Sequence, residues 1–170
     1  MSAARRGPAL WERSALAAEL ARRRAERPGL RVVLANGCFD LLHVGHVRYL
    51  EDARARGDLL VVALNDDASA RALKGAGRPA QPLAERAELV GALRAVDLVT
   101  SFSERDLEAT LRLLRPAVHA KGTDYSAESV PESAVDRELG IEIAICGDPK
   151  TRSSTAFLTY ARRAWPEGSE

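Results

Sequence analysis

Residues 32–46 read VVLANGCFDLLHVGH, an apolar run, a short turn, and two histidines three positions apart. The apolar run predicts a strand over residues 31–35, because continuous runs of this kind are typical of parallel strands that are buried on both faces. A helix is then expected over residues 45–56, with His46 in its first turn and His43 just before it. The N–H groups and the dipole of a helix N-terminus favour an anion. This order of elements therefore predicts a phosphate site.

Two histidines at this spacing also suit a metal site or a helix cap. No third His, Cys or carboxylate follows at a suitable spacing, and His119, the only other histidine, falls in an expected strand. The order of strand, turn, histidine pair and amphipathic helix favours phosphate. Gly45, between the histidines, would let backbone approach a bound group without a Cβ in the way. We therefore expect no metal ion held by protein side chains.

The length of 170 residues is that of a single globular domain. Basic and acidic residues number 25 and 24, so the chain has no broad electrostatic footprint for nucleic acid. The two cysteines, Cys38 and Cys146, form neither a disulfide framework nor a Cys-x-x-Cys pattern, which favours a reducing compartment. No apolar stretch is long enough for a signal peptide or a membrane span. We therefore expect a cytoplasmic protein without nucleic-acid or membrane partners.

Apolar runs and amphipathic stretches alternate along the chain, which predicts an α/β fold. The right-handed crossover rule then gives a Rossmann-like, doubly wound, five-stranded parallel sheet with ligands at the carboxyl ends of its strands. Strands are expected over residues 31–35, 59–64, 97–100, 116–120 and 141–146. Helices are expected over residues 10–27, 45–56, 65–73, 82–95, 103–115, 131–139 and 153–163, the 103–115 helix with a capping box at Ser103.

Several kinds of catalytic site are excluded by their missing motifs. The chain has no Walker A motif, no G-x-G-x-x-G after a strand and no G-x-S-x-G elbow, and Cys38 lacks a recognisable base partner. Positioning and electrostatics remain, as in phosphoryl or nucleotidyl transfer. Only three lysines occur, Lys74, Lys121 and Lys150, all expected in loops at the carboxyl ends of strands. They either converge on one anionic ligand or are chance survivors on the surface.

The stretch over residues 36–46 resembles the H-x-G-H signature of the cytidylyltransferase-like nucleotidyltransferase superfamily. The likeness is nearly continuous from residue 31 to residue 158 and resembles one branch, the D-glycero-β-D-manno-heptose 1-phosphate adenylyltransferases (ADP-heptose synthases). It implies a HIGH-type nucleotidyltransferase fold. The segments that carry this likeness are Asn65-Asp66-Asp67, Lys74-Gly75, Arg78-Pro79, Glu85-Arg86, Val96-Asp97, Lys121-Gly122-Thr123-Asp124-Tyr125 and Ser153-Ser154-Thr155-Ala156.

The resemblance also implies an organisation. Residues 1–30 would form an N-terminal helical extension packed on the domain, residues 31–164 the nucleotidyltransferase domain, and residues 165–170 a tail. Members of the branch often carry a sugar kinase domain ahead of the transferase. This chain would be the free-standing form, working as a homo-oligomer, a dimer or higher, with a separate sugar kinase in the pathway.

The implied reaction joins ATP to a sugar 1-phosphate. The phosphate of heptose 1-phosphate would attack the α-phosphorus of ATP in line, giving ADP-heptose and pyrophosphate, with Mg²⁺ bridging phosphate oxygens. His43 and His46 would donate hydrogen bonds to those oxygens, and Lys74 would swing in on a glycine-flanked loop to neutralise charge. Taken alone, Lys74 is equally a solvated loop lysine.

The resemblance also assigns binding roles. Asp40, Asp67 and Arg78 would face the acceptor, although each aspartate could be a turn or cap residue. Arg86 could be an ordinary surface arginine, Asp97 a turn residue at the start of a strand, and Ser153 a plain N-cap. The residues assigned to the nucleotide are Asn36, Gly37, Cys38, Phe39, Gly45, Arg86, Asp97, Lys121, Gly122, Asp124, Ser153, Ser154 and Thr155.

Residues 147–152 read GDPKTR, without the R-T-x-G-I-S-T signature of glycerol-phosphate and choline-phosphate cytidylyltransferases, which favours ATP over CTP. Gly-Gly-Asp-Tyr of the heptose branch is Gly122-Thr123-Asp124-Tyr125 here, a change that leaves the acceptor open. Two other functions therefore stay open. One is a cytidylyltransferase or other adenylyltransferase acting on glycerol phosphate or another small phosphorylated metabolite, and the other is a non-catalytic nucleotide-binding module.

Overall fold

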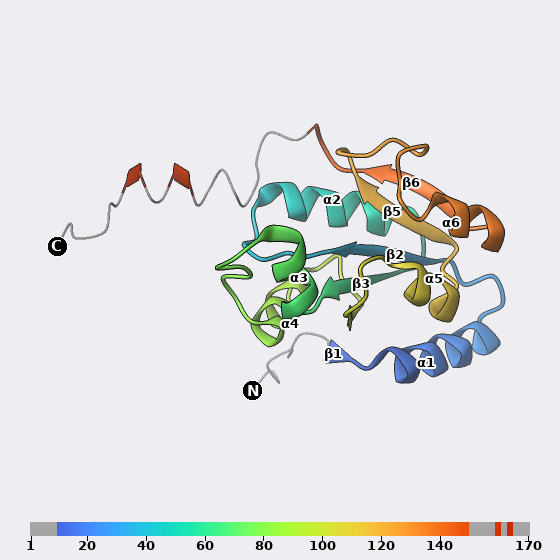
Figure 1. Cartoon of the computed structure of the whole chain (residues 1–170). Coiled ribbons are helices and arrows are strands. Elements are labelled where there is room, and N and C mark those ends of the chain that lie inside the picture. The colour runs from blue at the N-terminus through green and yellow to red at the C-terminus, as the bar shows by residue number, and fades with distance from the viewer. Residues whose placement is uncertain (1–9, 150–158, 161–162, 165–170) are drawn as a thin grey trace.

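The computed structural model describes residues 10–149, 159–160 and 163–164. Among these residues, strands and helices alternate as in an α/β fold, except that two helices follow one another between β3 and β4 (Figure 1). The elements are β1 (Leu10–Trp11), α1 (Arg13–Glu26), β2 (Val32–Gly37), α2 (Val44–Ala55), β3 (Leu59–Asn65), α3 (Asp67–Lys74), α4 (Leu83–Gly91), β4 (Leu98–Phe102), α5 (Glu108–Leu114), β5 (Val118–Gly122), α6 (Ser133–Leu139) and β6 (Glu142–Cys146).

The sheet is parallel throughout, with the strand order β1-β4-β3-β2-β5-β6. The predicted Rossmann-like α/β fold is confirmed, but the described sheet has six strands and not five. The additional strand is Leu10–Trp11, which was predicted as the start of a helix and instead pairs with Val99 and Thr100. Helix α1 begins only at Arg13, because the carboxylate of Glu12 accepts a hydrogen bond from an N–H of the first turn and caps the helix there.

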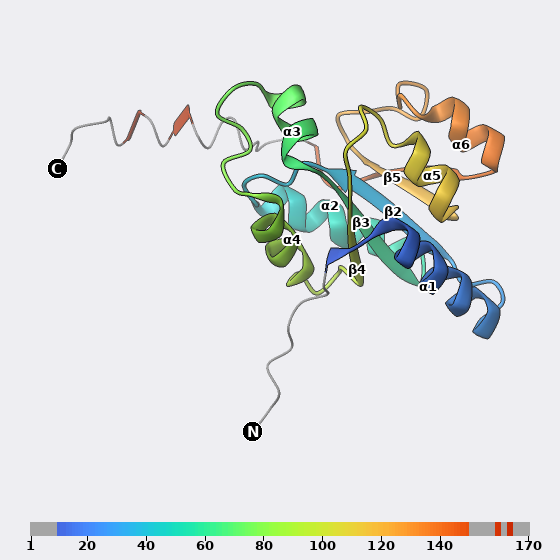
Figure 2. The same cartoon turned by 60° about the horizontal axis from the view of Figure 1, so that its bottom comes forward.

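Apolar residues alternate along each strand and fill two cores, one on each face of the sheet. Val33, Leu60 and Val62 pack with residues of α2 and α4 on one face. Leu34 and Val61 pack with residues of α1 and α5 on the other. Figures 1 and 2 show α2 on one side of the sheet and α1 and α5 on the opposite side.

The strand order reverses between β2 and β5, and this reversal indicates where a ligand is expected to bind. From β2 the chain builds outward through β3 to β4, then crosses to β5 and β6 on the other side. In a doubly wound sheet the crevice at the carboxyl ends of two such strands is the usual binding position. Asn36 and Gly37 at the end of β2 and Lys121 and Gly122 at the end of β5 therefore border this crevice.

Several predicted element bounds are wrong. Lys74 is the last residue of α3 and Lys121 lies within β5, whereas both were expected in loops. Helix α5 begins only at Glu108, and Leu107 rather than Ser103 is the residue at its N-cap position. Among the residues that the structure describes, no helix has the length and apolar character needed to cross a bilayer. The helix expected over residues 153–163 lies largely outside those residues.

Candidate functional site

A cavity of about 560 Å³ lies at the point where the strand order reverses. This volume falls within the range of small-molecule and cofactor sites. It is bordered by the loop after β2, the first turns of α2, the end of α3 and the loops after β5 and β6. The predicted site residues that line it are Asn36, Gly37, Cys38, Phe39, Asp40, His43, Gly45, His46, Lys74, Arg78, Lys121, Gly122 and Asp124.

The two histidines form one stack at the start of α2. Their ring centroids are 3.9 Å apart with an angle of 21° between the planes, and the ring of Phe39 lies 5.0 Å from His46. The carbonyl oxygen of His43 accepts hydrogen bonds from the N–H groups of His46 at 2.9 Å and Val47 at 3.4 Å, while the side chain of His43 does not cap the helix. Both imidazoles therefore border the cavity beside the positive end of the helix dipole.

Gly45 leaves room for the His43 ring. A Cβ at position 45 would lie 3.0 Å from both Nδ1 and Cε1 of His43. Gly37 acts in the same way for Phe39, because a Cβ at position 37 would lie 2.9 Å from that ring. Both glycines thus leave room for aromatic side chains of the site, a reason that differs from the approach of a bound group expected from the sequence.

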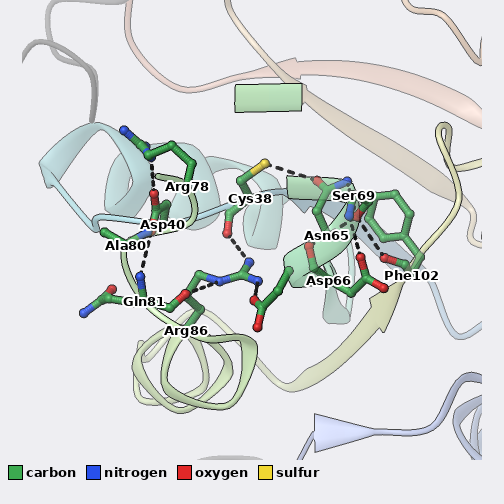
Figure 3. Close-up of polar contacts among 11 residues, drawn as sticks. Cys38, Asp40, Asn65, Asp66, Ser69, Arg78, Ala80, Gln81, Arg86 and Phe102 are labelled. Carbon is green, nitrogen blue, oxygen red and sulfur yellow. Dashed lines mark hydrogen bonds and ion pairs between the residues drawn. The ribbon is translucent and has the colours of Figure 1, made fainter. Parts of the chain in front are cut away.

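Asp40 anchors the loop that connects α3 to α4. It is 2% exposed, and its carboxylate accepts hydrogen bonds from Nε of Arg78 at 2.5 Å and from the N–H groups of Ala80 at 2.7 Å and Gln81 at 3.1 Å (Figure 3). These contacts agree with the interpretation of Asp40 as a turn residue. They place Arg78 at the cavity, whereas a direct contact between Asp40 and an acceptor remains a prediction.

Arg86 is fully buried and does not line the cavity. Its guanidinium donates from Nε to the carbonyl oxygen of Gln81 at 3.0 Å, from Nη1 to that of Cys38 at 2.6 Å, and from Nη2 to Oδ1 of Asp67 at 2.7 Å (Figure 3). Asp67 is likewise absent from the lining. The sequence placed Arg86 at the nucleotide and Asp67 at the acceptor, but the side chain of Arg86 points inward from α4 and pairs with Asp67.

Asp97 lies at the wrong end of the sheet for a nucleotide contact. It immediately precedes β4, where its carboxylate accepts the N–H of Leu60 at 2.8 Å and pairs with Arg54 at 2.9 Å. Ligands of this fold bind at the carboxyl ends of the strands, and Asp97 is at an amino end. The structure therefore corrects the predicted nucleobase contact and supports the alternative, a turn residue at the start of a strand.

The two described lysines occupy contrasting positions at the cavity. Lys74 is exposed at the end of α3, and the glycines that follow at positions 75 and 77 have φ values of 94° and 77° with open space around them. Lys121 is only 5% exposed, and its Nζ lies 3.1 Å from Oδ1 of Asn36 and 3.0 Å from Oε2 of Glu132. Lys74 is thus a solvated charge at the rim, and Lys121 a fixed one in the wall.

The sequence did not predict a second group of cavity residues, on α2 and in the loop after β6. Arg48 pairs with Asp148 at 2.8 Å, and Thr123 donates to the carbonyl oxygen of Asp148 at 2.8 Å. The Tyr49 hydroxyl donates to the carbonyl oxygen of Ala120 at 2.8 Å. Helical spacing from the histidines could have indicated Arg48 and Tyr49. The predicted residues Ser153, Ser154 and Thr155, and Lys150, lie outside the described part of the chain.

The acidic residues of the cavity suit a cation that arrives with phosphate. Within the described ranges, no cluster of three or more His, Cys, Asp or Glu side chains is placed to hold a metal ion. Asp124 and Asp148 line the cavity and are exposed, so they offer oxygen donors of the kind that Mg²⁺ takes, usually together with water and substrate phosphate. Asp40 is a poorer donor because its oxygens already accept three hydrogen bonds.

Neither cavity cysteine has the properties of a nucleophile. Burial raises the pKa of the Cys38 thiol, and burial together with the charge of Asp52 raises the pKa of Cys146 to about 11. A nucleophilic cysteine needs the thiolate form near neutral pH. The raised pKa of each thiol therefore argues against a covalent intermediate on either sulfur.

A family model described as cytidylyltransferase-like matches residues 34–159. Among curated proteins, the bifunctional protein HldE of Pseudomonas paraeruginosa is 45% identical over 139 residues, and that of Azotobacter vinelandii is also 45% identical over 139 residues. Each match covers 82% of this chain and 29% of the relative. The chain thus spans less than a third of the length of these relatives.

Solved structures with a similar fold include the lipopolysaccharide core biosynthesis protein from Thermoplasma volcanium. It has a TM-score of 0.63 and 30% identity, over 72% of this chain and all of that protein. The pantothenate synthetase from Thermus thermophilus has a TM-score of 0.53 and 18% identity, over 79% of this chain and 61% of that one, which is a likeness of fold alone.

Proposed function

The chain belongs to the cytidylyltransferase-like family and is a nucleotidyltransferase, and from that premise we propose that it transfers AMP from ATP to D-glycero-β-D-manno-heptose 1-phosphate. The observation that carries this proposal is the His43–His46 stack at the start of α2, beside the cavity. Two imidazoles, helix N–H groups and a nearby lysine form a set of donors suited to a triphosphate.

In the proposed reaction, an oxygen of the sugar phosphate attacks the α-phosphorus of ATP in line. A new P–O bond forms, the bond from the α-phosphorus to the bridging oxygen breaks, and pyrophosphate leaves with that electron pair. His43 and His46 donate hydrogen bonds to phosphate oxygens as negative charge builds on them, and Lys74 neutralises the leaving group from the rim. Mg²⁺ bound with the triphosphate would neutralise further charge, and the exposed carboxylates of Asp124 and Asp148 at the cavity would be the candidates to hold it.

The choice of substrates rests on the sequence and on the relatives. The loop after β6 lacks the cytidylyltransferase signature, which supports ATP. The similar proteins named HldE and the lipopolysaccharide core biosynthesis protein support a role in lipopolysaccharide sugar metabolism. We further propose that the protein is cytoplasmic and works as a homo-oligomer, a dimer or higher.

The test is a matrix of nucleotides and acceptors. Purified protein is incubated with Mg²⁺ and each of ATP, CTP, GTP and UTP, against heptose 1-phosphate of both anomers, glucose 1-phosphate, glycerol 3-phosphate and phosphocholine, and pyrophosphate release is followed. Turnover with ATP and the β-anomer of heptose 1-phosphate is expected to exceed all other pairs. Turnover with CTP and an alcohol phosphate would overturn the substrate assignment, and nucleotide binding without turnover on any acceptor would favour a binding module.

A further inference from the structure

Lys121 connects the two strands at which the strand order reverses. It extends from β5, and its ammonium lies 3.1 Å from the side-chain oxygen of Asn36 at the end of β2. The same ammonium lies 3.0 Å from Oε2 of Glu132, just before α6, and 5.4 Å from the centre of the Tyr125 ring. Lys121 also lines the cavity. The ammonium of Lys121 therefore lies between the protein interior and the cavity.

The ammonium of Lys121 is held from two sides and still borders the cavity. A lysine ammonium carries three N–H donors and no acceptor. One N–H donates to Oδ1 of Asn36, and the ion pair with Glu132 holds the ammonium as a charge. A remaining N–H can reach an acceptor atom in the cavity, and its direction depends on how firmly Asn36 and Glu132 hold the ammonium.

Glu132 is itself held at both carboxylate oxygens. Oε1 accepts the N–H of Leu107 at 3.2 Å, and Oε2 pairs with Lys121. The Glu132 and Lys121 side chains are 5% and 7% exposed. Burial raises the pKa of Glu132, but the ammonium of Lys121 and the N–H of Leu107 are among the contacts that together lower it by more, so the net pKa lies below the usual value and the carboxylate is charged. A buried ammonium without this partner would be strongly disfavoured.

A second buried pair joins the same two elements without lining the cavity. His119, two residues before Lys121 and on the same face of β5, lies 2.9 Å through Nδ1 from Oδ2 of Asp136 in α6, and both side chains are fully buried. Neither residue lines the cavity. The His119–Asp136 pair therefore attaches α6 to β5 as the Lys121–Glu132 pair does, and it serves as a structural control.

We propose that Glu132 is a positioning residue, which holds the ammonium of Lys121 so that its remaining N–H points to an acceptor atom of the bound nucleotide. This inference rests on the proposed function, in which the cavity binds a nucleoside triphosphate. The contact is made in the ground state, so it contributes to nucleotide affinity more than to the rate of the chemical step.

The test compares equilibrium binding of ATP to the full chain by isothermal titration calorimetry. Glu132→Gln removes the charge that holds Lys121 and keeps the size of the side chain. We expect it to weaken ATP binding by about tenfold, as for the loss of one charge-assisted hydrogen bond, and to raise KM for ATP while kcat changes by less than about threefold. Lys121→Met should weaken binding at least as much, and the double variant should bind no more weakly than Lys121→Met.

Asp136→Asn is the matched control. It should lower the thermal midpoint and leave the ATP affinity within about twofold of the wild type, since it disturbs α6 without reaching the cavity. Glu132→Asp keeps the charge but withdraws it by one methylene, so it should fold even where the Gln variant does not, and it should also bind ATP more weakly. Equal losses of affinity in Asp136→Asn and Glu132→Gln would overturn the inference, as would wild-type affinity in Glu132→Asp.

ATP binding by the wild type distinguishes a failure of the proposed function from a failure of the role proposed for Glu132. If it binds neither ATP nor CTP, the proposed function fails and this inference with it. If it binds ATP and Glu132→Gln binds equally well, the inference alone fails.

Discussion

The guanidinium of Arg86 donates a hydrogen bond to the carbonyl oxygen of Cys38 at 2.6 Å, joining α4 to the loop that leads into the two histidines. The same guanidinium binds the carbonyl of Gln81 and the carboxylate of Asp67, so three separate segments meet at one buried cation. This arrangement makes the shape of the cavity wall depend on a residue that does not line it.

Arg86→Met should destabilise the fold and lower activity through the loop at Cys38. Three acceptors would lose their buried donor, which costs on the order of 3 kcal/mol in the free energy of unfolding. Urea unfolding measures the loss, and Arg94→Met, at an arginine that is 93% exposed, is the control. A variant that kept its stability and lost only nucleotide affinity would show instead that Arg86 binds the nucleotide directly.

His46→Ala should lower kcat by at least about 100-fold, the loss typical of one preorganised donor to developing charge. The thermal midpoint should change little, because the ring borders the cavity rather than filling the core. Glu51→Ala, on the same helix and away from the cavity lining, should keep wild-type activity. Steady-state kinetics decide the matter, and unchanged turnover in His46→Ala would mean that the chemistry lies elsewhere.

Gly45→Ala separates stability from activity. Alanine is favoured over glycine inside a helix by about 1 kcal/mol, so the unfolding free energy should hold or rise. The new Cβ would meet the His43 ring at 3.0 Å and displace it, so turnover should fall by about tenfold or more. Parallel thermal melts and kinetics provide the comparison. Full activity would show that the position of the His43 ring is not critical.

The cavity cysteines should react slowly near neutral pH. A raised pKa keeps a thiol protonated, and the thiolate of Cys146 forms only as the pH rises through about 11. The alkylation rate with iodoacetamide, followed by mass spectrometry from pH 7 to pH 9.5, should therefore stay below that of a free thiol. Cys38→Ser should keep activity within about threefold, because no covalent step uses the sulfur. Loss of turnover by orders of magnitude in that variant would contradict this account.

Asp97→Asn should affect stability and not nucleotide affinity. The carboxylate accepts the N–H of Leu60 and pairs with a partly exposed Arg54, so the expected loss is about 1 kcal/mol after allowance for solvent screening. KM for ATP should be unchanged, because the residue lies at the amino end of β4. A rise in KM with unchanged stability would restore the nucleobase contact that the sequence resemblance implied.

Strand positions were predictable because parallel strands buried on both faces leave long apolar runs, as in Val32–Gly37 and Leu59–Asn65. Strand β1 was not, since two residues are too few to show any period and the pairing with β4 is a tertiary contact. Helix α5 began later than predicted, at Glu108. The segment before it contacts α1 through the Arg13–Glu104 ion pair, a tertiary contact that a local capping pattern does not show.

The sequence by itself determined the Rossmann-like α/β fold, because the buried parallel strands leave apolar runs in it. It also determined which residues of the loop over residues 36–46 line the cavity together, because these residues are continuous in the chain. The tertiary structure alone decided which charged residues reach the cavity. Arg86 turned inward and Asp97 lies at the far end of the sheet, since burial and strand polarity are set by packing. The pairing of Glu132 with Lys121 was also decided by the tertiary structure. A buried ammonium needs a counter-charge, and only folding brings the carboxylate of Glu132 within 3.0 Å of it.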